Sequence, residues 1–118
     1  MSQIQQSDAI GLLSKLLSER IPLQVFFASP SGTQVSMSGF VDSMTRDNGL
    51  VISASGPPVD VARGYVNFFP FGRNCDFWYG DKREVPAESL PSTEARGDSA
   101  LMFTLPASGE RFVLFFTI

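Results

Sequence analysis

The sequence predicts a mainly β fold: a small, strongly bent open barrel of five or more strands, with one N-terminal α-helix. Three features lead to this class. Turn residues interrupt the apolar runs twice between residues 23 and 55, apolar residues alternate within those runs, and a segment near the N-terminus has helical spacing instead. Because 118 residues suffice for one domain with a true core, we expect a single domain over 1–118.

Two tight turns divide residues 23–55 into three antiparallel strands. The first turn contains Pro30, which presets its backbone for a turn, and Gly32, which accepts a positive φ. The second contains Asn48-Gly49, a strong hairpin signal when it lies between apolar runs. These turns place strands at about 23–29, 33–46 and 50–55.

The middle strand of the three alternates between an apolar and a polar face, as a pleated strand does. One face carries Val35, Met37, Gly39 and Val41. The other face carries, in order, Gln34, Ser36, Ser38, Phe40 and Asp42. Gly39 lies at the centre of the strand, where the lack of a side chain permits the sharp bend of a small barrel.

Residues 7–20 form the segment with helical spacing. Ser7 is the expected N-cap and Asp8 falls in the first turn, where a negative charge is favourable. Pro22 is expected to end the helix, because the residue before a proline is pushed toward extended geometry. An apolar stripe predicts that the helix covers the open end of the barrel, through Ala9, Ile10, Leu12, Leu13, Leu16 and Leu17.

The section 59–98 has a different composition and reads as an aromatic insertion. Half of the aromatic residues of the chain lie in 65–79. Pro70 and Gly72 interrupt this run, which indicates two short strand-like pieces, at 64–69 and 75–79. The polar remainder, 80–98, contains two prolines and predicts a loop without regular structure.

The last part of the chain predicts a second hairpin, with strands at about 99–105 and 111–118. The final strand reads RFVLFFTI and is apolar on both faces. A strand of this kind is either central in a closed sheet or buried in a contact between subunits.

The helix at 7–20, the bent meander and the closing strands resemble the Sm and Sm-like family of small β-barrels. The residues that carry the resemblance are Gly32, Val35, Gly39-Phe40-Val41-Asp42, Asn48-Gly49-Leu50-Val51-Ile52 and Arg111-Phe112-Val113-Leu114. The resemblance covers about two-thirds of the chain and omits the aromatic insertion. It implies a five-stranded open barrel that assembles into rings and binds RNA, with Asp42, Asn48 and Arg111 as the matching RNA-binding positions. Small barrels of the SH3 or OB type are alternative folds.

The composition argues against enzymatic chemistry. The chain has no histidine, the commonest general base and metal ligand, so none can activate its single Cys75, which reads as an inert thiol. Asp76 and Asp81 flank the aromatic run and could hold a metal, but turn and solvent roles explain them equally well. We therefore expect no catalytic residues, no metal and no cofactor.

The composition also bears on the location of the protein. Apolar residues make up 43% and charged residues 18%, which excludes disordered and collagen-like chains. The lone cysteine fits a reducing compartment, and we find neither a secretory signal nor a run long enough to span a membrane. These features predict a cytoplasmic protein with no membrane partner.

The sharper binding hypothesis concerns basic residues interleaved with aromatic ones. Between residues 63 and 83 there are four basic residues against two acids, whereas the formal charge of the whole chain is −3. Basic and aromatic residues in this arrangement are typical of a single-stranded nucleic-acid platform. The candidate binding residues of this section are Arg63, Tyr65, Arg73, Trp78, Tyr79, Lys82 and Arg83.

Two other interpretations explain the same residues. Rings and arginines are enriched in subunit interfaces, so the section could contribute to the core and to self-association. It could also form a surface for a peptide or a small ligand. Taken together, the sequence predicts a non-enzymatic binding or assembly module of Sm-like type that forms a homo-oligomer. Binding of single-stranded RNA or DNA is the first alternative, and binding of a peptide or small ligand is the second.

Overall fold

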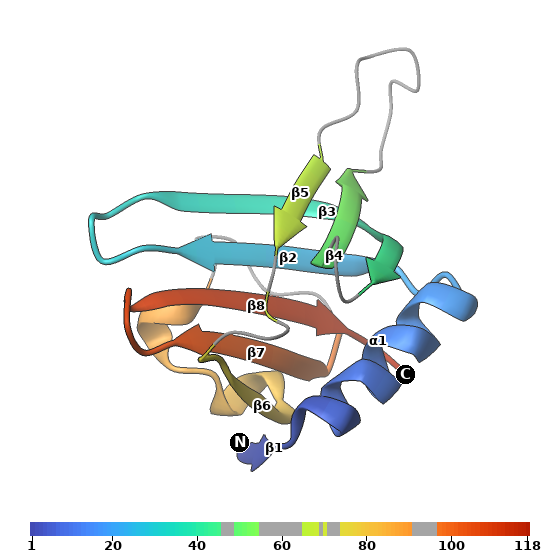
Figure 1. The fold of residues 1–118 in the computed structure, drawn as a ribbon, viewed down its shortest axis with the longest axis horizontal. Helices are drawn as coiled ribbons and strands as arrows, with labels where there is room; N and C mark the ends of the chain where they lie inside the picture. The colour runs from blue at the N-terminus through green and yellow to red at the C-terminus, as the bar shows by residue number, and fades with distance from the viewer. Residues whose placement is uncertain (46–48, 55–64, 69, 71–73, 91–96) are drawn as a thin grey trace.

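The computed structural model describes residues 1–45, 49–54, 65–68, 70, 74–90 and 97–118. Within this part of the chain, eight antiparallel strands form one open sheet in the order β1-β6-β7-β8-β2-β3-β4-β5, accompanied by one N-terminal helix (Figure 1). The elements are β1 (Ser2–Ile4), α1 (Gln6–Ser18), β2 (Leu23–Ala28), β3 (Gln34–Thr45), β4 (Gly49–Ala54), β5 (Tyr65–Phe68), β6 (Asp76–Asp81), η1 (Lys82–Glu84), η2 (Ala87–Ser89), β7 (Ser99–Leu105) and β8 (Glu110–Phe116).

The mainly β class with one N-terminal helix is confirmed. The five expected strands correspond to β2, β3, β4, β7 and β8, and the two aromatic pieces correspond to β5 and β6. The prediction of an irregular loop over 80–98 is wrong in its first half. There β6 extends to Asp81 and two 3-10 helices follow, the first of which is capped by the side chains of Asp81 and Glu84.

Helix α1 starts and ends differently from the expectation. Its N-cap is Gln5, not Ser7, because the Asp8 carboxylate accepts a hydrogen bond from the Gln5 backbone N–H at 3.2 Å. The helix ends at Ser18, before the predicted end at residue 20. Arg20 takes a left-handed conformation with φ 48°, and the amides of residues 20 and 21 donate to the carbonyls of residues 17 and 16. This is a Schellman motif, which ends a helix without help from the proline.

The bend of the sheet is built into β3. Its first half, up to Gly39, pairs with β2, and its second half, from Gly39 onward, pairs with β4. Gly39 is thus opposite Leu23 on one side and Ala54 on the other. A register shift between Val41 and Ser43 adds a bulge directly after this corner. As a result, β4 and β5 run across the direction of β2 (Figure 1).

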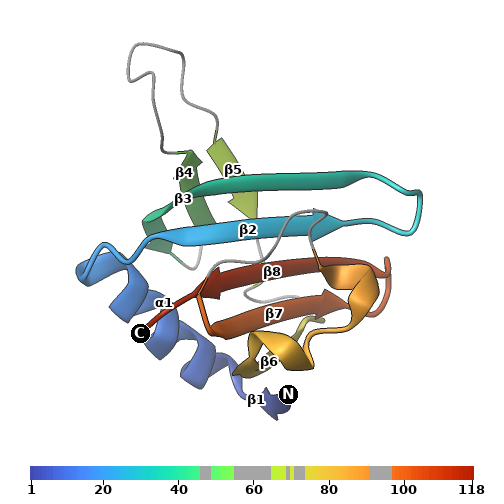
Figure 2. The ribbon, with the colours of Figure 1, turned by 180° about the vertical axis from the view of Figure 1, so that it is seen from behind.

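Alternating side chains give the sheet two covered faces. The face toward α1, which we call the helix face, buries Leu13 and Leu16 of the helix with Phe103, Phe112 and Leu114 of the sheet. The helix leucines therefore pack on a face of the sheet, beside β3 and β6. The helix crosses this side near the end of β3 (Figures 1 and 2).

The opposite face, which we call the strap face, buries a second cluster: Phe26, Ala28, Val85, Ala100, Met102, Val113 and Phe115. Strand β8 lies between β7 and β2 and contributes to both clusters. The apolar pattern on both faces of the last strand is therefore explained by a central position, although the sheet is open and not closed.

Candidate functional site

Residues 82–90, which we call the strap, follow β6 and fold back over the strap face (Figure 2). Asp81 starts the strap by accepting hydrogen bonds from the Arg83 backbone at 2.9 Å and from its guanidinium at 3.0 and 3.1 Å. Glu84 accepts from the Asp81 amide at 3.1 Å and from the α-ammonium group of Met1. Val85 is then buried in the strap-face cluster, so the strap is attached by charge at its start and by apolar packing in its middle.

These contacts shift Asp81 and Glu84 toward the charged form. The hydrogen bonds from the Arg83 side chain and amide lower the pKa of Asp81 to about 2. The α-ammonium group of Met1, followed by the Asp81 amide, lowers the pKa of Glu84. Both carboxylates therefore stay ionised at neutral pH and keep their hydrogen bonds.

The far end of the strap is attached less completely. Glu88 accepts from Arg111 Nη1 at 3.2 Å, with the Glu88 side chain 61% exposed and that of Arg111 31% exposed. Within the described part of the chain, Arg111 Nε and Ser89 Oγ are buried without a hydrogen-bond partner. A buried donor left unpaired costs about 1–3 kcal/mol. This end of the strap is consequently the part whose polar groups are not satisfied.

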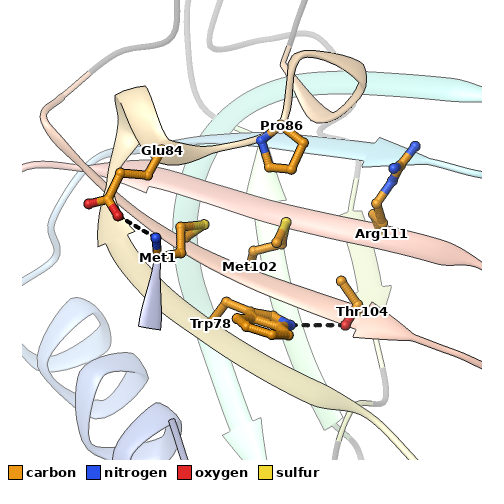
Figure 3. Close-up of a pocket in the computed structure, with 7 residues that line it drawn as sticks. All are labelled: Met1, Trp78, Glu84, Pro86, Met102, Thr104 and Arg111. Carbon is orange, nitrogen blue, oxygen red and sulfur yellow. Dashed lines mark hydrogen bonds and ion pairs between the residues drawn. The ribbon is translucent and has the colours of Figure 1, made fainter. Parts of the chain in front are cut away.

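An open cleft of about 430 Å³ lies between the strap and strands β6 to β8. We call it the Trp78 cleft, and it is lined by Met1, Trp78, Glu84, Pro86, Met102, Thr104 and Arg111 (Figure 3). The strand register explains its floor, because Trp78 lies opposite Met102 and Thr104 lies opposite Arg111. An apolar pair and a polar pair are thus adjacent on the same face of the sheet.

The Trp78 side chain is held by a hydrogen bond within the cleft. Its indole Nε1 donates to Thr104 Oγ1 at 3.1 Å, and the ring is half-buried (Figure 3). This uses the single donor of the indole, whereas the Thr104 hydroxyl keeps its own hydrogen to donate. The ring is therefore a fixed apolar surface, and the polar functions at the floor of the cleft come from Thr104 and Arg111.

Charges are separated along the cleft. The Met1 ammonium and Glu84 pair with each other at one end, and Arg111 lies at the other end (Figure 3). Both oxygens of Glu84 already accept hydrogen bonds. Arg111 in turn has five N–H donors and reaches Glu88 through Nη1 alone, so it is the less firmly paired cation of the cleft.

A second hollow, of about 230 Å³, lies where the turn after α1 meets the end of β8. Ile21, Pro22, Leu23, Gly97, Phe116 and Thr117 line it, and none of these side chains is charged. It offers little chemistry for the recognition of a polar ligand.

Of the candidate binding residues of the aromatic section, those whose side chains the structure describes do not lie on one surface. Trp78 lies on the strap face, whereas Tyr79 lies on the helix face and stacks on Phe116 with ring centroids 6.4 Å apart. Lys82 and Arg83 belong to η1, and the Arg83 guanidinium is paired with Asp81. Adjacent residues of a strand point to opposite faces, so the two rings cannot form one stacking platform.

The other predicted site residues are dispersed. Arg111 lines the Trp78 cleft, and Asp42 is exposed at the bulge of β3. Tyr65 is the first residue of β5, at the other edge of the sheet. Arg63, Arg73 and Asn48 lie outside the described residues.

Five residues that line the cleft were not predicted from the sequence as binding residues: Met1, Glu84, Pro86, Met102 and Thr104. A signal for two of them exists in residues 99–105, where Leu101, Phe103 and Leu105 alternate with residues 100, 102 and 104. A hydroxyl residue at 104 breaks an otherwise apolar face, which marks a position where a polar contact is made.

The described residues contain no group of three or more potential metal ligands, and Asp76 accepts a hydrogen bond from the side-chain amide of Gln3 at 3.3 Å. No helix in this part of the chain is long and apolar enough to cross a membrane. By its fold the chain is a small mainly β domain with one N-terminal helix. No protein-family model, curated protein or solved structure matches it.

Proposed function

We propose that this chain is a non-enzymatic binding module that holds a small ligand in the Trp78 cleft. The observation that supports the proposal is the combination, in one open cleft, of an apolar floor and a cationic group with unused donors. Trp78 and Met102 form the floor, and Arg111 is the cationic group.

The dimensions and composition of the cleft agree with this use. Small-ligand sites typically enclose about 300–1,000 Å³ and combine apolar walls with a few placed polar groups. The Trp78 cleft has about 430 Å³, apolar residues at its floor, and the Thr104 hydroxyl beside Arg111. The fixed orientation of the Trp78 ring means that a ligand would find this surface already formed.

The proposal is tested with the neutral apolar dye Nile red. Thr104→Phe places a ring in the cleft, and the matched change Thr33→Phe places the same ring at an exposed position beside the turn between β2 and β3. We expect Thr104→Phe to weaken the emission increase of the dye several-fold, because it fills the cleft. Thr33→Phe should leave the emission unchanged or increase it.

Two results would contradict the proposal. One is a chain that gives no emission increase with Nile red. The other is an equal increase in both variants, which would place the dye elsewhere on the surface. Circular dichroism of both variants establishes that each is folded before the dye is compared.

Self-association into a homo-oligomer is a second candidate function, and the open sheet favours it. Among the described residues the edges of the sheet are β1 and β5, since β8 is central. Unpaired strand edges are templates for pairing with another chain. A second copy could pair with β5, and light scattering at micromolar concentration would then give a mass of two or more chains. A monomer mass would exclude this candidate.

The kinship with the Sm-like family and the binding of single-stranded RNA or DNA stay predictions. Two members of the basic and aromatic set are engaged elsewhere, Arg83 with Asp81 and Tyr79 with Phe116. Nucleic-acid binding would appear as oligonucleotide retention that falls steeply with salt, because phosphate contacts release counterions.

A further inference from the structure

We infer that the ligand of the Trp78 cleft is a small monocarboxylate with an apolar body, whose carboxylate binds Arg111 in place of Glu88. This inference rests on the proposed function and adds to it the chemical class of the ligand. It follows from three properties of the cleft: its layout, its charge and the present partner of Arg111.

The layout favours a ligand with two chemically different ends. Trp78 and Met102 are opposite each other in the register, and two residues further along β7 Thr104 is opposite Arg111. Two residues of a strand span about 7 Å. A short alkyl chain or a single ring on the Trp78–Met102 pair would therefore bring an attached polar group to Thr104 and Arg111.

The charge of the cleft favours an anion with a single negative charge. Arg111 is the cation available, because its partner Glu88 is held by Nη1 alone and is 61% exposed, whereas Glu84, the partner of the Met1 ammonium, is also held by the Asp81 amide. Two acids, Glu84 and Glu88, lie close by and would repel a doubly charged phosphate. A cationic ligand is less favoured, because the charge of Glu84, the acid that lines the cleft, is already paired with the Met1 ammonium.

The present partner of Arg111 is replaceable. Glu88 contacts Nη1 alone, at 3.2 Å, and its side chain is 61% exposed, so that water can solvate it when it is released. Nε of Arg111 meanwhile has no acceptor among the described residues. The Nε and Nη2 edge of a guanidinium binds a carboxylate by two parallel hydrogen bonds. A ligand carboxylate that moves the Glu88 end of the strap aside can thus make more hydrogen bonds than Glu88 makes now.

The Thr104 hydroxyl supports the same assignment. Its oxygen accepts from the Trp78 indole, which directs its own hydrogen to another acceptor. A carboxylate beside Arg111 would provide that acceptor. The apolar and polar parts of the ligand would then be recognised by one connected set of side chains.

The inference is tested with two probes that differ in one group, octanoate and octanamide, at neutral pH. Trp78 is the one tryptophan of the chain, so its fluorescence reports on the cleft directly. We expect both probes to change the Trp78 emission, with octanoate binding about tenfold more tightly, because a charge-assisted hydrogen bond replaces a neutral one.

Variants test whether the preference for octanoate over octanamide depends on Arg111. Arg111→Gln should reduce the affinity for octanoate to that for octanamide, and Glu88→Gln should raise the affinity for octanoate, because it removes the competing carboxylate. Lys15→Gln is the control, because it removes one positive charge from an exposed position of α1. It should change neither affinity. If Arg111→Gln does not fold, Glu88→Gln and the two probes on the unmodified chain still test the inference.

The possible outcomes separate the ligand class from the proposed function. Equal binding of octanoate and octanamide, unaffected by Glu88→Gln, overturns the monocarboxylate inference but leaves a cleft that binds apolar ligands. A Trp78 emission that neither probe changes overturns both. If Arg111→Gln still prefers octanoate, another cation binds the carboxylate, and this result also overturns the inference.

Discussion

Trp78 of β6 donates its indole N–H to the hydroxyl oxygen of Thr104 on β7, at 3.1 Å, and this bond orients the ring that forms the floor of the cleft. Removal of the acceptor should therefore affect both stability and the position of the ring. We expect Thr104→Val, which keeps the shape of the side chain, to lower the free energy of unfolding by about 1 kcal/mol, because a partly buried donor loses its partner.

Urea unfolding followed by circular dichroism measures this effect. Thr104→Ser retains the hydroxyl and serves as the control, with a smaller loss expected. Equal losses for the valine and serine variants would show that the hydrogen bond does not contribute and that the methyl group accounts for the change.

The left-handed conformation of Arg20 gives a second prediction. Its φ is 48°, and its guanidinium lies 4.8 Å from the centroid of the Phe40 ring. Arg20→Ala and Arg20→Gly both lose the contact with Phe40, but only glycine adopts this conformation without strain. Arg20→Gly should therefore be more stable than Arg20→Ala by about 1 kcal/mol in thermal or urea unfolding. If the alanine variant is the more stable one, the Schellman motif at the end of α1 is not the conformation in solution.

Two glycines should respond oppositely to alanine. Gly97 has φ 72°, and a Cβ there would overlap the backbone carbonyl of Phe116, so Gly97→Ala should destabilise the fold by about 2 kcal/mol or more. Gly11 lies in α1 with open space around it, so Gly11→Ala should stabilise the fold by about 1 kcal/mol through helix propensity. Paired urea titrations measure both changes, and effects of the same sign would contradict the described backbone.

The start of the strap should depend on pH in the acid range. The pKa of Asp81 is lowered to about 2 by the hydrogen bonds from Arg83, so the folded state binds the proton more weakly than the unfolded chain does. The contribution of this carboxylate is therefore complete above its unfolded pKa of about 4 and is lost as the pH falls toward about 2. The pKa of Glu84 is lowered as well, so its contribution is lost in the same direction.

Asp81→Asn isolates this effect. Its free energy of unfolding should differ from that of the unmodified chain at neutral pH, and the difference should shrink as the pH falls through this range. Arg83→Gln removes the guanidinium and should reduce the same pH-dependent part, while the backbone amide of residue 83 still donates to Asp81. A difference that does not change with pH would show that Asp81 acts through the shape of the turn alone.

The local parts of the fold followed from the sequence, because they depend on neighbouring residues. The turn at Gly32, the alternation along β3 and the bend at Gly39 were all expected, and the structure has a positive φ at Gly32 and a change of pairing partner at Gly39. The end of α1 was placed wrongly, since an arginine in the left-handed region is uncommon and a proline two residues later is the stronger signal.

Only part of the site could be predicted from the sequence, because segments that are distant in the sequence form it. Trp78 and Arg111 were both named as binding residues, the first from the aromatic section and the second from the family resemblance. Their proximity depends on the order β6-β7-β8, which no local pattern specifies. The strap depends on contacts with Met1, 83 residues away in sequence, and with Arg111, 23 residues away. Polarity and prolines alone predicted an irregular loop there.

The central position of β8 affects how the chain folds during synthesis. Strand β2 is made early, yet one of its two neighbours in the sheet is β8, whose residues 111–115 pair with residues 24–28. Until β8 has left the ribosome, an apolar edge that includes Phe26 has no partner and is exposed to other nascent chains. The sheet can therefore close around β2 only after the last strand has been made.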